Sequence, residues 1–237
     1  MTKMKWIVAL LAVASAQAGA QTITLTTEDY PPFNFSTDGG KTMTGSATDV
    51  MNEVLKRTGI KATISLLPWE RAYNDALKNK DTCVYSATRT EAREKLFKWV
   101  GPLAADSWTL FAKQDSTITA KSLDDVKKYT IAGYQGDAKT LFLKEKGLKV
   151  EEAMNDAQNG KKLDAGRVDL WAASSSVGPW VAKSNNIKIK PVIAFQDVQL
   201  YAACNLGMAD ADIAKMNDAV KAIQADGTFE KFSKAYK

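Results

Sequence analysis

The sequence predicts an α/β protein built from two successive series of strands and helices. Short stretches rich in Val, Ile and Thr alternate with segments whose apolar residues recur every three to four positions, and this order occurs twice along the chain. Each series ends in a strand that carries small polar residues at its carboxyl end. Because ligands collect at the carboxyl ends of strands in open α/β sheets, two such lobes facing each other would enclose a ligand cleft.

The first series begins with a strand in which Ile23 and Leu25 alternate with threonines. Gly59 marks the end of the first helix, and Pro68 stops the second strand. The predicted elements are a strand at 22–27, a helix at 47–58, a strand at 62–67, a helix at 69–78 and a strand that starts near residue 82.

The second series follows a strand predicted at 107–112 and repeats the pattern. The turn Gln135-Gly136-Asp137 opens its main helix. The predicted elements are a helical turn at 122–126, a strand at 130–134, a helix at 138–146, a short strand at 149–150, a helix at 156–163, a strand at 167–173, a helix at 180–183, strands at 191–195 and 200–206, a helix at 210–225 and a last helix from residue 228.

Residues 1–20 are typical of a secretory signal peptide. Lys3 and Lys5 precede an apolar stretch at 6–14, and small residues at 18–20 form a cleavage site. The apolar stretch is shorter than the roughly 20 residues that a membrane-spanning helix needs. The alternative is an uncleaved anchor. We expect cleavage near Ala20 and a mature periplasmic protein of about 217 residues.

Composition excludes several functions. The net charge of +5 is mild and scattered, which argues against a nucleic-acid groove. The chain contains no histidine, so Ser-His-Asp and Cys-His nucleophile systems and histidine-ligated zinc are excluded. We expect neither a metal nor another cofactor.

The two cysteines, Cys83 and Cys204, form an even pair in an oxidising compartment, which favours a disulfide. Both lie in short apolar stretches that resemble strands. Two unpaired buried thiols are the alternative.

The stretch from Asp81 to Arg93 carries the strongest functional signal. A short apolar run ends in Ser86 and Thr88, and Arg89 and Arg93 follow. This pattern is typical of a buried strand that delivers hydroxyl groups and a guanidinium to the mouth of a cleft, where the planar guanidinium suits a carboxylate. The alternative is a strand end followed by the solvated start of a basic helix.

Five short motifs occur in order along the chain: EDYPPF, SATRTEAR, AGYQGDA, AGRVDLWAAS and a closing DGTFEKF. With these motifs the mature chain resembles the extracytoplasmic solute-binding proteins of family 3, the polar amino acid type that serves ABC importers. The resemblance implies the two-lobed periplasmic binding protein fold of type II, with each lobe an α/β sheet, two crossover strands between the lobes and a ligand cleft. It implies a first lobe of residues 21–110 and 200–237 and a second lobe of residues 111–199.

The resemblance also implies a function. The protein would be a monomer that captures a small carboxylate-bearing solute, an amino acid or a related organic acid, for an inner-membrane ABC permease, without catalysis. Cys83 and Cys204 would lie on neighbouring strands of the first lobe, which strengthens the disulfide prediction.

In relatives, the arginine that matches Arg93 clamps the ligand carboxylate, so the resemblance favours Arg93 over Arg89. The residue matching Thr88 lends its hydroxyl and amide groups, and the residue matching Ser86 offers its carbonyl oxygen to the ligand amine.

The other implied site residues lie outside this segment. Asp137 and Ala138 open a helix whose free N–H groups would meet the same carboxylate, and an ordinary N-cap role for Asp137 is compatible with this. Tyr30 and Trp69 match positions that form an apolar wall for the ligand, with a purely structural role in the core as the alternative.

One position departs from the family pattern. Five residues beyond the position of Asp169, amino acid binders carry an aspartate that pairs with the ligand ammonium, and Ser174 stands there in this chain. A serine cannot neutralise a buried ammonium. Either another carboxylate replaces it, with Glu28, Asp29 and Glu70 as candidates, or the ligand is a carboxylate without an α-amine.

Two other functions are compatible with the sequence. Some relatives on this scaffold are dehydratases or lytic transglycosylases, and Glu28 or Glu70 would be the general acid of such an enzyme. The third possibility is a sensor that passes ligand occupancy to a separate membrane receptor.

Overall fold

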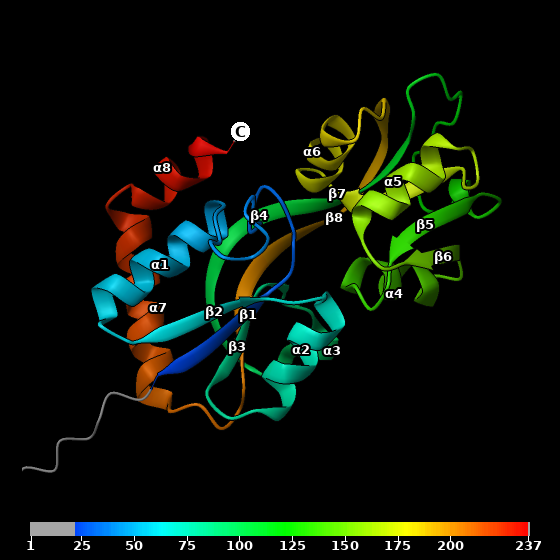
Figure 1. Cartoon of the computed structure of the whole chain (residues 1–237). Helices are drawn as coiled ribbons and strands as arrows, with labels where there is room; N and C mark the ends of the chain where they lie inside the picture. Colours follow the sequence, from blue (N-terminus) through cyan, green and yellow to red (C-terminus); the bar gives the residue numbers. More distant parts are fainter. Residues whose placement is uncertain (1–21, 237) are drawn as a thin grey trace, which may run out of the picture.

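A computed structural model describes residues 22–236, and the predicted signal peptide lies outside these residues. All strands form one eight-stranded sheet in the order β2-β1-β3-β8-β4-β7-β5-β6. Two long antiparallel strands, β4 (Lys98–Lys113) and β8 (Ile189–Cys204), run from one half of the molecule into the other and curve between them (Figure 1). The α/β prediction and the two-lobed fold are confirmed.

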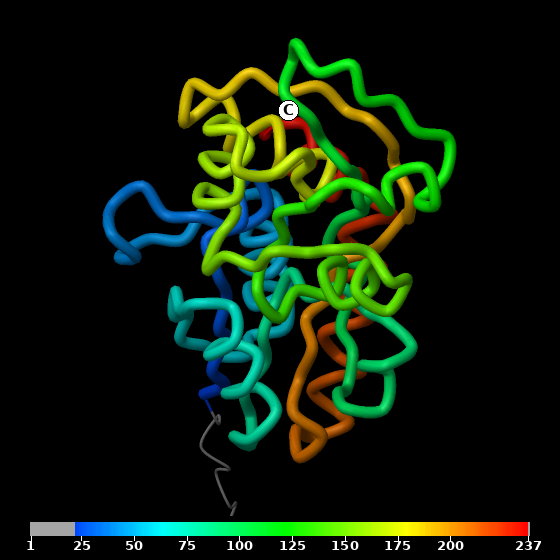
Figure 2. The backbone as a smooth tube through the Cα atoms, turned by 90° about the vertical axis from the view of Figure 1, so that its right-hand side faces the viewer, coloured from blue at the N-terminus to red at the C-terminus, as the bar shows by residue number. Residues whose placement is uncertain are grey.

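The first lobe combines segments from both ends of the chain, as the blue and orange-to-red parts of Figure 2 show. Its inner strand β1 pairs in parallel with β2 and β3. Helices α1, α7 and α8 cover one side of this sheet, and α2 and α3 cover the other (Figure 1). The bounds are β1 Ile23–Thr27, α1 Ser46–Thr58, β2 Ala62–Leu66, α2 Trp69–Lys78, β3 Thr82–Thr88, α3 Glu91–Glu94, α7 Asp210–Ala225 and α8 Thr228–Ala235.

The second lobe is continuous between the two long strands. Strand β5 pairs in parallel with β6 and β7, and helices α4, α5 and α6 pack around them. The bounds are η1 Asp124–Val126 (a 3₁₀ turn), β5 Thr130–Tyr134, α4 Ala138–Glu145, β6 Lys149–Ala153, α5 Asp156–Asp164, β7 Leu170–Ser174 and α6 Val177–Ser184.

The long strands differ from the sequence prediction. Strand β4 starts at Lys98 rather than at residue 107, and the separate strands predicted at 191–195 and 200–206 are one continuous strand. The polar residues Gln196 and Asp197 between them do not end the strand, because both pair with β4. Two adjacent strands that each cross the boundary once provide a hinge between the lobes.

The predicted disulfide is confirmed. Cys83 of β3 and Cys204 of β8 lie directly opposite each other in the antiparallel ladder, and their sulfur atoms are bonded. The bond lies near the start of β3, whereas Thr88 at the other end of this strand faces the second lobe. The disulfide therefore braces the first lobe away from the cleft.

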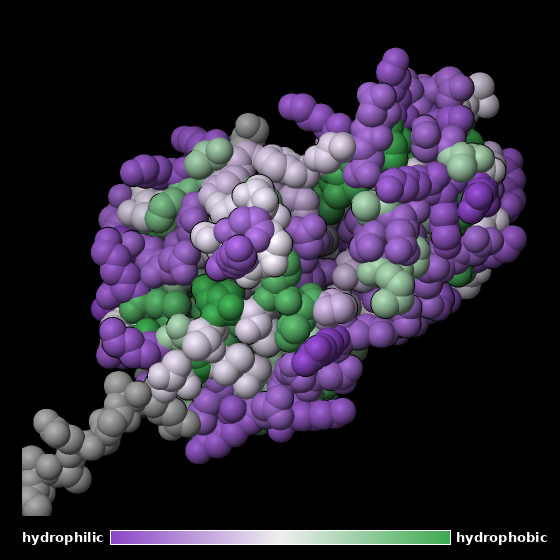
Figure 3. Space-filling view, in the orientation of Figure 1, coloured by the Kyte–Doolittle hydropathy of each residue, from purple (hydrophilic) through white to green (hydrophobic). Residues whose placement is uncertain are grey.

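The surface is mostly hydrophilic in the view of Figure 3, with apolar side chains gathered over the edge strand β2. Ile64 and Leu66 of this strand are half-buried. No helix within residues 22–236 combines the length and the apolar character that crossing a membrane requires.

Candidate ligand-binding site

The carboxyl end of β3 reaches the boundary between the lobes. A register shift between Val84 and Ala87 interrupts its pairing with β8, and Ser86 at this bulge has a left-handed φ of 64°. Bulges of this kind redirect side chains, often beside functional sites. Ser86 is buried, and its Oγ has no hydrogen-bond partner within the described part of the chain. Thr88 ends the strand and is half-buried.

Arg93 is buried although it lies on the short helix α3, with only 7% of its surface exposed. Its guanidinium lies over the rings of Trp69 and Tyr73, 5.2 and 5.0 Å from their centroids. Nη1 donates to the carbonyl oxygen of Thr88, and Nη2 donates across the lobe boundary to that of Gly136, both at 3.4 Å. These long contacts hold the side chain in place, and no carboxylate within residues 22–236 pairs with its positive charge.

Arg89 has a different environment. It is exposed, lies over the rings of Trp99 and Tyr201, and forms two hydrogen bonds with the Glu94 carboxylate, at 2.7 and 2.5 Å. Its charge is therefore already paired. The geometry agrees with the choice of Arg93 over Arg89, and Arg93 is not part of a solvated helix face.

The turn between β5 and α4 provides the opposite wall. Gly136 has φ 70°, which favours glycine, and its carbonyl oxygen accepts hydrogen bonds from Arg93 and from Trp69 Nε1, the latter at 3.1 Å. Asp137 caps α4 by accepting from the backbone N–H of Lys139 at 2.8 Å. Asp137 therefore has the N-cap role, and Trp69 lies at the boundary between the lobes.

Tyr30 and Ser174 meet across the cleft. The Tyr30 hydroxyl group of the first lobe is hydrogen-bonded to Ser174 Oγ at the end of β7, and both residues are buried. The position where relatives are expected to carry an acid thus holds a neutral pair of hydroxyl groups.

A group of buried ionisable side chains lies beside this pair. Lys139 is fully buried, with Nζ 2.9 Å from Asp137 Oδ2 and 5.6 Å from the centroid of the Tyr30 ring. Asp156 is buried at the start of α5, and its Oδ1 accepts from Trp171 Nε1 at 3.0 Å. Glu28 reaches the group from the first lobe with 4% of its surface exposed.

Burial and the charges of neighbouring groups shift the pKa values of these side chains. Burial, followed by repulsion from Asp137, raises the pKa of Glu28 to about 8. Burial also raises the pKa of Asp156. Burial opposes the charge of Lys139, but the nearby carboxylates of Asp137 and Asp156 outweigh it and raise the pKa of the ammonium group. Near neutral pH the Glu28 carboxyl group therefore holds a proton while Lys139 is charged.

The structure separates the three candidate acids. Asp29 and Glu70 are both exposed, whereas Glu28 is enclosed between the lobes. Of the three, only Glu28 has the surroundings of a group that would interact with an enclosed ligand.

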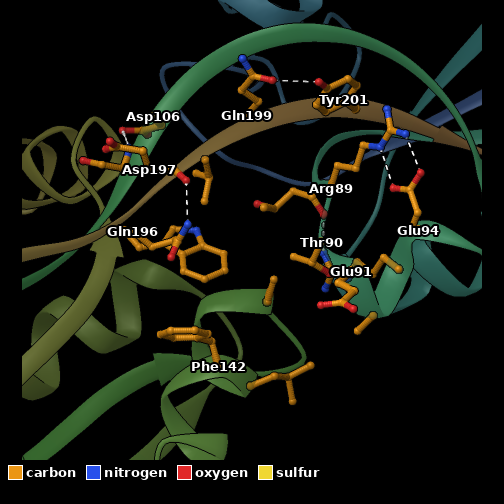
Figure 4. A pocket seen from close by; sticks show the side chains of 18 of the residues that line it. Arg89, Thr90, Glu91, Glu94, Asp106, Phe142, Gln196, Asp197, Gln199 and Tyr201 are labelled. Carbon is orange, nitrogen blue, oxygen red and sulfur yellow. Dashed lines mark hydrogen bonds and ion pairs between the residues drawn. The ribbon is translucent and has the colours of Figure 1, made fainter.

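A hollow of about 1750 Å³ opens between the lobes beside the hinge (Figure 4). Thr88, Arg93 and Ala138 line it, so three of the predicted site residues share one cavity. Asp106 and Asp197 reach it from the neighbouring strands β4 and β8, on the side away from the Arg89–Glu94 ion pair (Figure 4). The other predicted site residues do not line this hollow; Asp137 is half-buried, and the rest are buried, namely Glu28, Tyr30, Trp69, Ser86 and Ser174.

Sequence reasoning missed several of these residues. Lys139 follows directly after the AGYQGDA motif, and a lysine at that helix position looks solvated in the sequence. Asp106 lies in the part of β4 that was predicted to be outside a strand; it accepts hydrogen bonds from Ser175 Oγ and the Ser107 backbone N–H. Only the fold brings these side chains to the cleft.

Two lobes that meet over a buried, unpaired guanidinium define a protein that encloses a small solute on closure. The chain belongs to the bacterial extracellular solute-binding proteins, family 3, whose family model matches residues 23–237.

Individual relatives agree with this family. The probable amino-acid-binding protein YxeM of Bacillus subtilis (strain 168) is 28% identical over 259 residues, covering 100% of this chain and 96% of YxeM. The L-cystine-binding protein TcyJ of Escherichia coli (strain K12) is 25% identical over 212 residues, covering 87% of this chain and 79% of TcyJ. A solved structure of an ancestral arginine-binding protein bound to glutamine superposes with a TM-score of 0.79 and 25% identity, over 91% of this chain and 97% of that one.

Proposed function

We propose that this protein captures a small carboxylate-bearing solute between its lobes in the periplasm and delivers it, as a monomer, to an ABC importer of the inner membrane. Arg93 carries the proposal. Its guanidinium is buried at the cleft, and within residues 22–236 no carboxylate forms an ion pair with it. An unpaired buried charge is costly, so a ligand carboxylate would satisfy it in the bound state.

The neighbouring groups support the same ligand. The hydroxyl group of Thr88 and the first turn of α4 at Ala138 line the hollow beside Arg93, and backbone N–H groups at a helix N-terminus favour an anion. We assign ligand contacts as well to the remaining residues of the interlobe set, which are Glu28, Tyr30, Trp69, Ser86, Asp137 and Ser174.

A thermal-shift screen of amino acids, dicarboxylates and aromatic acids tests the carboxylate assignment. We expect at least one carboxylate to raise the Tm of the mature wild type and of Arg89→Ala, but not that of Arg93→Ala. Loss of the charge-assisted hydrogen bonds of Arg93 should weaken binding by about 3 kcal/mol, on the order of a hundredfold in Kd.

Arg89→Ala is a matched control because Arg89 lies four residues away, also contacts two aromatic rings and is exposed. Circular dichroism establishes that both variants are folded. A best ligand that stabilises wild type and Arg93→Ala equally would show that Arg93 is not the carboxylate site.

The importer is a separate part of the proposal. Genes for a permease and an ATPase beside this gene would support transport. Uptake of the best ligand by cells that lack the gene should fall, and unchanged uptake would contradict the delivery role. Fractionation followed by N-terminal sequencing should find the protein in the periplasm, starting near Gln21.

A dehydratase-like enzyme on the same fold is the second candidate, and one observation favours it. A general acid must hold a proton near neutral pH, and Glu28, whose pKa is raised to about 8, does so. Product analysis after incubation of each stabilising ligand with the protein separates the two functions, because a binding protein returns its ligand unchanged.

A further inference from the structure

The loop after β1 contacts the second lobe at two places. Tyr30, near the start of the loop, is hydrogen-bonded to Ser174 at the end of β7. Phe35, further along the loop, packs against Trp180 on α6, with ring centroids 5.5 Å apart and ring planes inclined at 52°. Because α6 follows β7 in the chain, the same two segments meet twice across the boundary between the lobes. The second contact has no role in the proposed ligand site.

The first lobe holds its half of this second contact in place. Phe35 and Thr44 exchange two backbone hydrogen bonds of 2.9 Å across the loop. Tyr236, which follows α8, lies edge-on against the Phe35 ring, with centroids 6.2 Å apart. The Tyr236 hydroxyl group donates to Asp49 Oδ2 at 2.8 Å and is hydrogen-bonded to Thr44 Oγ1 at 2.9 Å. All these partners belong to the first lobe, so Phe35 forms a preformed surface for Trp180.

The lobes do not pack continuously around this contact. A groove of about 580 Å³ lies beside it, between α6, α8 and the hinge strand β4, and Trp180 and Tyr236 both line this groove (Figure 1). Phe35 and Trp180 are half-buried, and neither lines the hollow beside Arg93. The two rings therefore bridge the lobes at a place that a solute in the hollow would not touch.

Rotation about the hinge would separate the two rings. Trp180 belongs to the second lobe, whereas Phe35 and Tyr236 belong to the first, so a hinge motion moves the tryptophan away from its partner. A contact between two aromatic rings favours the state that contains it by about two- to tenfold beyond the effect of the buried area. Such a factor is large enough to change the balance between closed and open lobes.

We propose that Phe35 and Trp180 form a latch that keeps the lobes together without a solute, and that Tyr236 holds Phe35 ready for it. Because the rings belong to different lobes, the latch raises the fraction of molecules in which the lobes meet. A solute then binds to a protein whose closed form is already populated, and its apparent affinity increases with that fraction. This last consequence rests on the proposed function, whereas the latch itself does not.

Single-molecule energy transfer measures the closed fraction of the mature protein, refolded with its disulfide intact to remove any co-purified solute. The two native cysteines are bonded to each other, so dyes can be attached to Thr63→Cys and Lys149→Cys, at exposed positions on the outermost strands β2 and β6. The labelled protein is compared with Phe35→Leu, Trp180→Leu and the double variant. Tyr129→Leu is the control, because Tyr129 is also half-buried but packs against the apolar cluster within the second lobe.

We expect a closed population in the labelled wild type, and a closed-to-open ratio that is about two- to tenfold lower in Trp180→Leu. Phe35→Leu should shift the ratio in the same direction. The double variant should shift it by less than the product of the two single effects, because both substitutions remove the same contact. Tyr129→Leu should leave the ratio unchanged, and circular dichroism establishes that each variant is folded.

The opposite outcomes are equally clear. A wild type that stays open without a solute overturns the latch, and so does an unchanged ratio in Trp180→Leu or an equal decrease in Tyr129→Leu. Effects of Phe35→Leu and Trp180→Leu that multiply in the double variant would mean that the rings act separately, which also overturns it. No solute enters these measurements, so their failure leaves the proposed function intact. Failure of the Arg93→Ala test would overturn that function and leave the latch.

Discussion

The two lobes contribute opposite kinds of surface to the cleft. The first lobe presents two guanidinium groups, those of Arg93 and Arg89, on a chain of aromatic rings whose neighbouring centroids are 5.2–6.0 Å apart; the rings are those of Trp69, Tyr73, Phe97, Trp99 and Tyr201. The second lobe presents a buried ion group around Lys139. Aromatic packing holds the first surface in place and a disulfide braces the lobe behind it, whereas the second surface depends on charge balance. We therefore expect the first lobe to set the stability of the protein, and the second to respond to pH and to the ligand.

The largest expected effect concerns the disulfide of the first lobe. Replacing both Cys83 and Cys204 by alanine should lower the free energy of unfolding by about 5 kcal/mol, because the bond closes a loop with a sequence separation of 121 residues. Urea denaturation of the double variant measures this loss. A thiol count on unfolded, unreduced wild type should find no free sulfhydryl groups. A loss below about 1 kcal/mol would mean that other contacts already define the lobe.

The next effect concerns the buried lysine of the second lobe. Lys139→Met keeps the volume but leaves the half-buried Asp137 carboxylate without its partner at 2.9 Å, which should cost about 3 kcal/mol of unfolding free energy. Lys144→Met is the control, since the Lys144–Glu152 pair is partly exposed and should contribute less than about 1 kcal/mol.

A second substitution separates charge from packing at the same place. Adding Asp137→Asn to Lys139→Met removes the unpaired charge, so the double variant should regain most of the lost stability. If the double variant is as unstable as Lys139→Met, the lysine stabilises the protein through its packing. The surface of the second lobe would then not depend on charge balance.

The pH dependence of stability should come mainly from the interlobe boundary. The pKa of Glu28 is raised from 4.5 to about 8 in the folded protein, so the folded state binds more protons than the unfolded state between these values. The free energy of unfolding should therefore fall by a few kcal/mol as pH rises from about 5 to 8. Glu28→Gln should flatten this decline, as measured by urea denaturation at several pH values.

Acidic residues elsewhere act with the opposite sign at lower pH. Hydrogen bonds and ion pairs lower the pKa of Asp226 to about 2 and lower that of Glu94, so their stabilisation is lost only as pH falls. The difference between wild type and Glu28→Gln isolates the buried group. Parallel pH profiles for the two proteins would contradict the assignment.

Local signals in the sequence predicted much of the fold. Helices α2 and α7 occur at the predicted bounds because Pro68 and the acidic first turn at Asp210 mark their starts, and the apolar period continues without a break. The lengths of the two long strands that form the hinge were not predicted. Gln196 and Asp197 of β8 are both exposed, so two separate strands were predicted on either side of them, although pairing with β4 continues through this stretch.

The candidate site likewise has one part that the sequence predicted and one part that it did not. The order of the motifs favoured Arg93, and its burial agrees with that choice. The ion group could not be predicted, since a lysine on the first turn of a helix carries no sign of its burial until the Tyr30 ring of the other lobe covers it. Charge balance across two lobes is a property of their packing, and local sequence patterns do not report it.

The smallest effect tests whether the contact between the lobes, rather than either lobe alone, controls ligand binding. Trp69 Nε1 donates to Gly136 of the second lobe, and Trp99 Nε1 donates to Glu94 within the first lobe, both at 3.1 Å. Trp69→Phe and Trp99→Phe each remove one such bond and keep an aromatic ring, so each should lower the free energy of unfolding by about 1 kcal/mol. Only Trp69→Phe removes a bond between the lobes, so it should weaken the best ligand about fivefold in titrations while Trp99→Phe leaves Kd unchanged. Equal Kd values for both variants would mean that ligand binding does not depend on this bond. The contacts of Arg93 and of the buried ion group would then be sufficient to hold the lobes together.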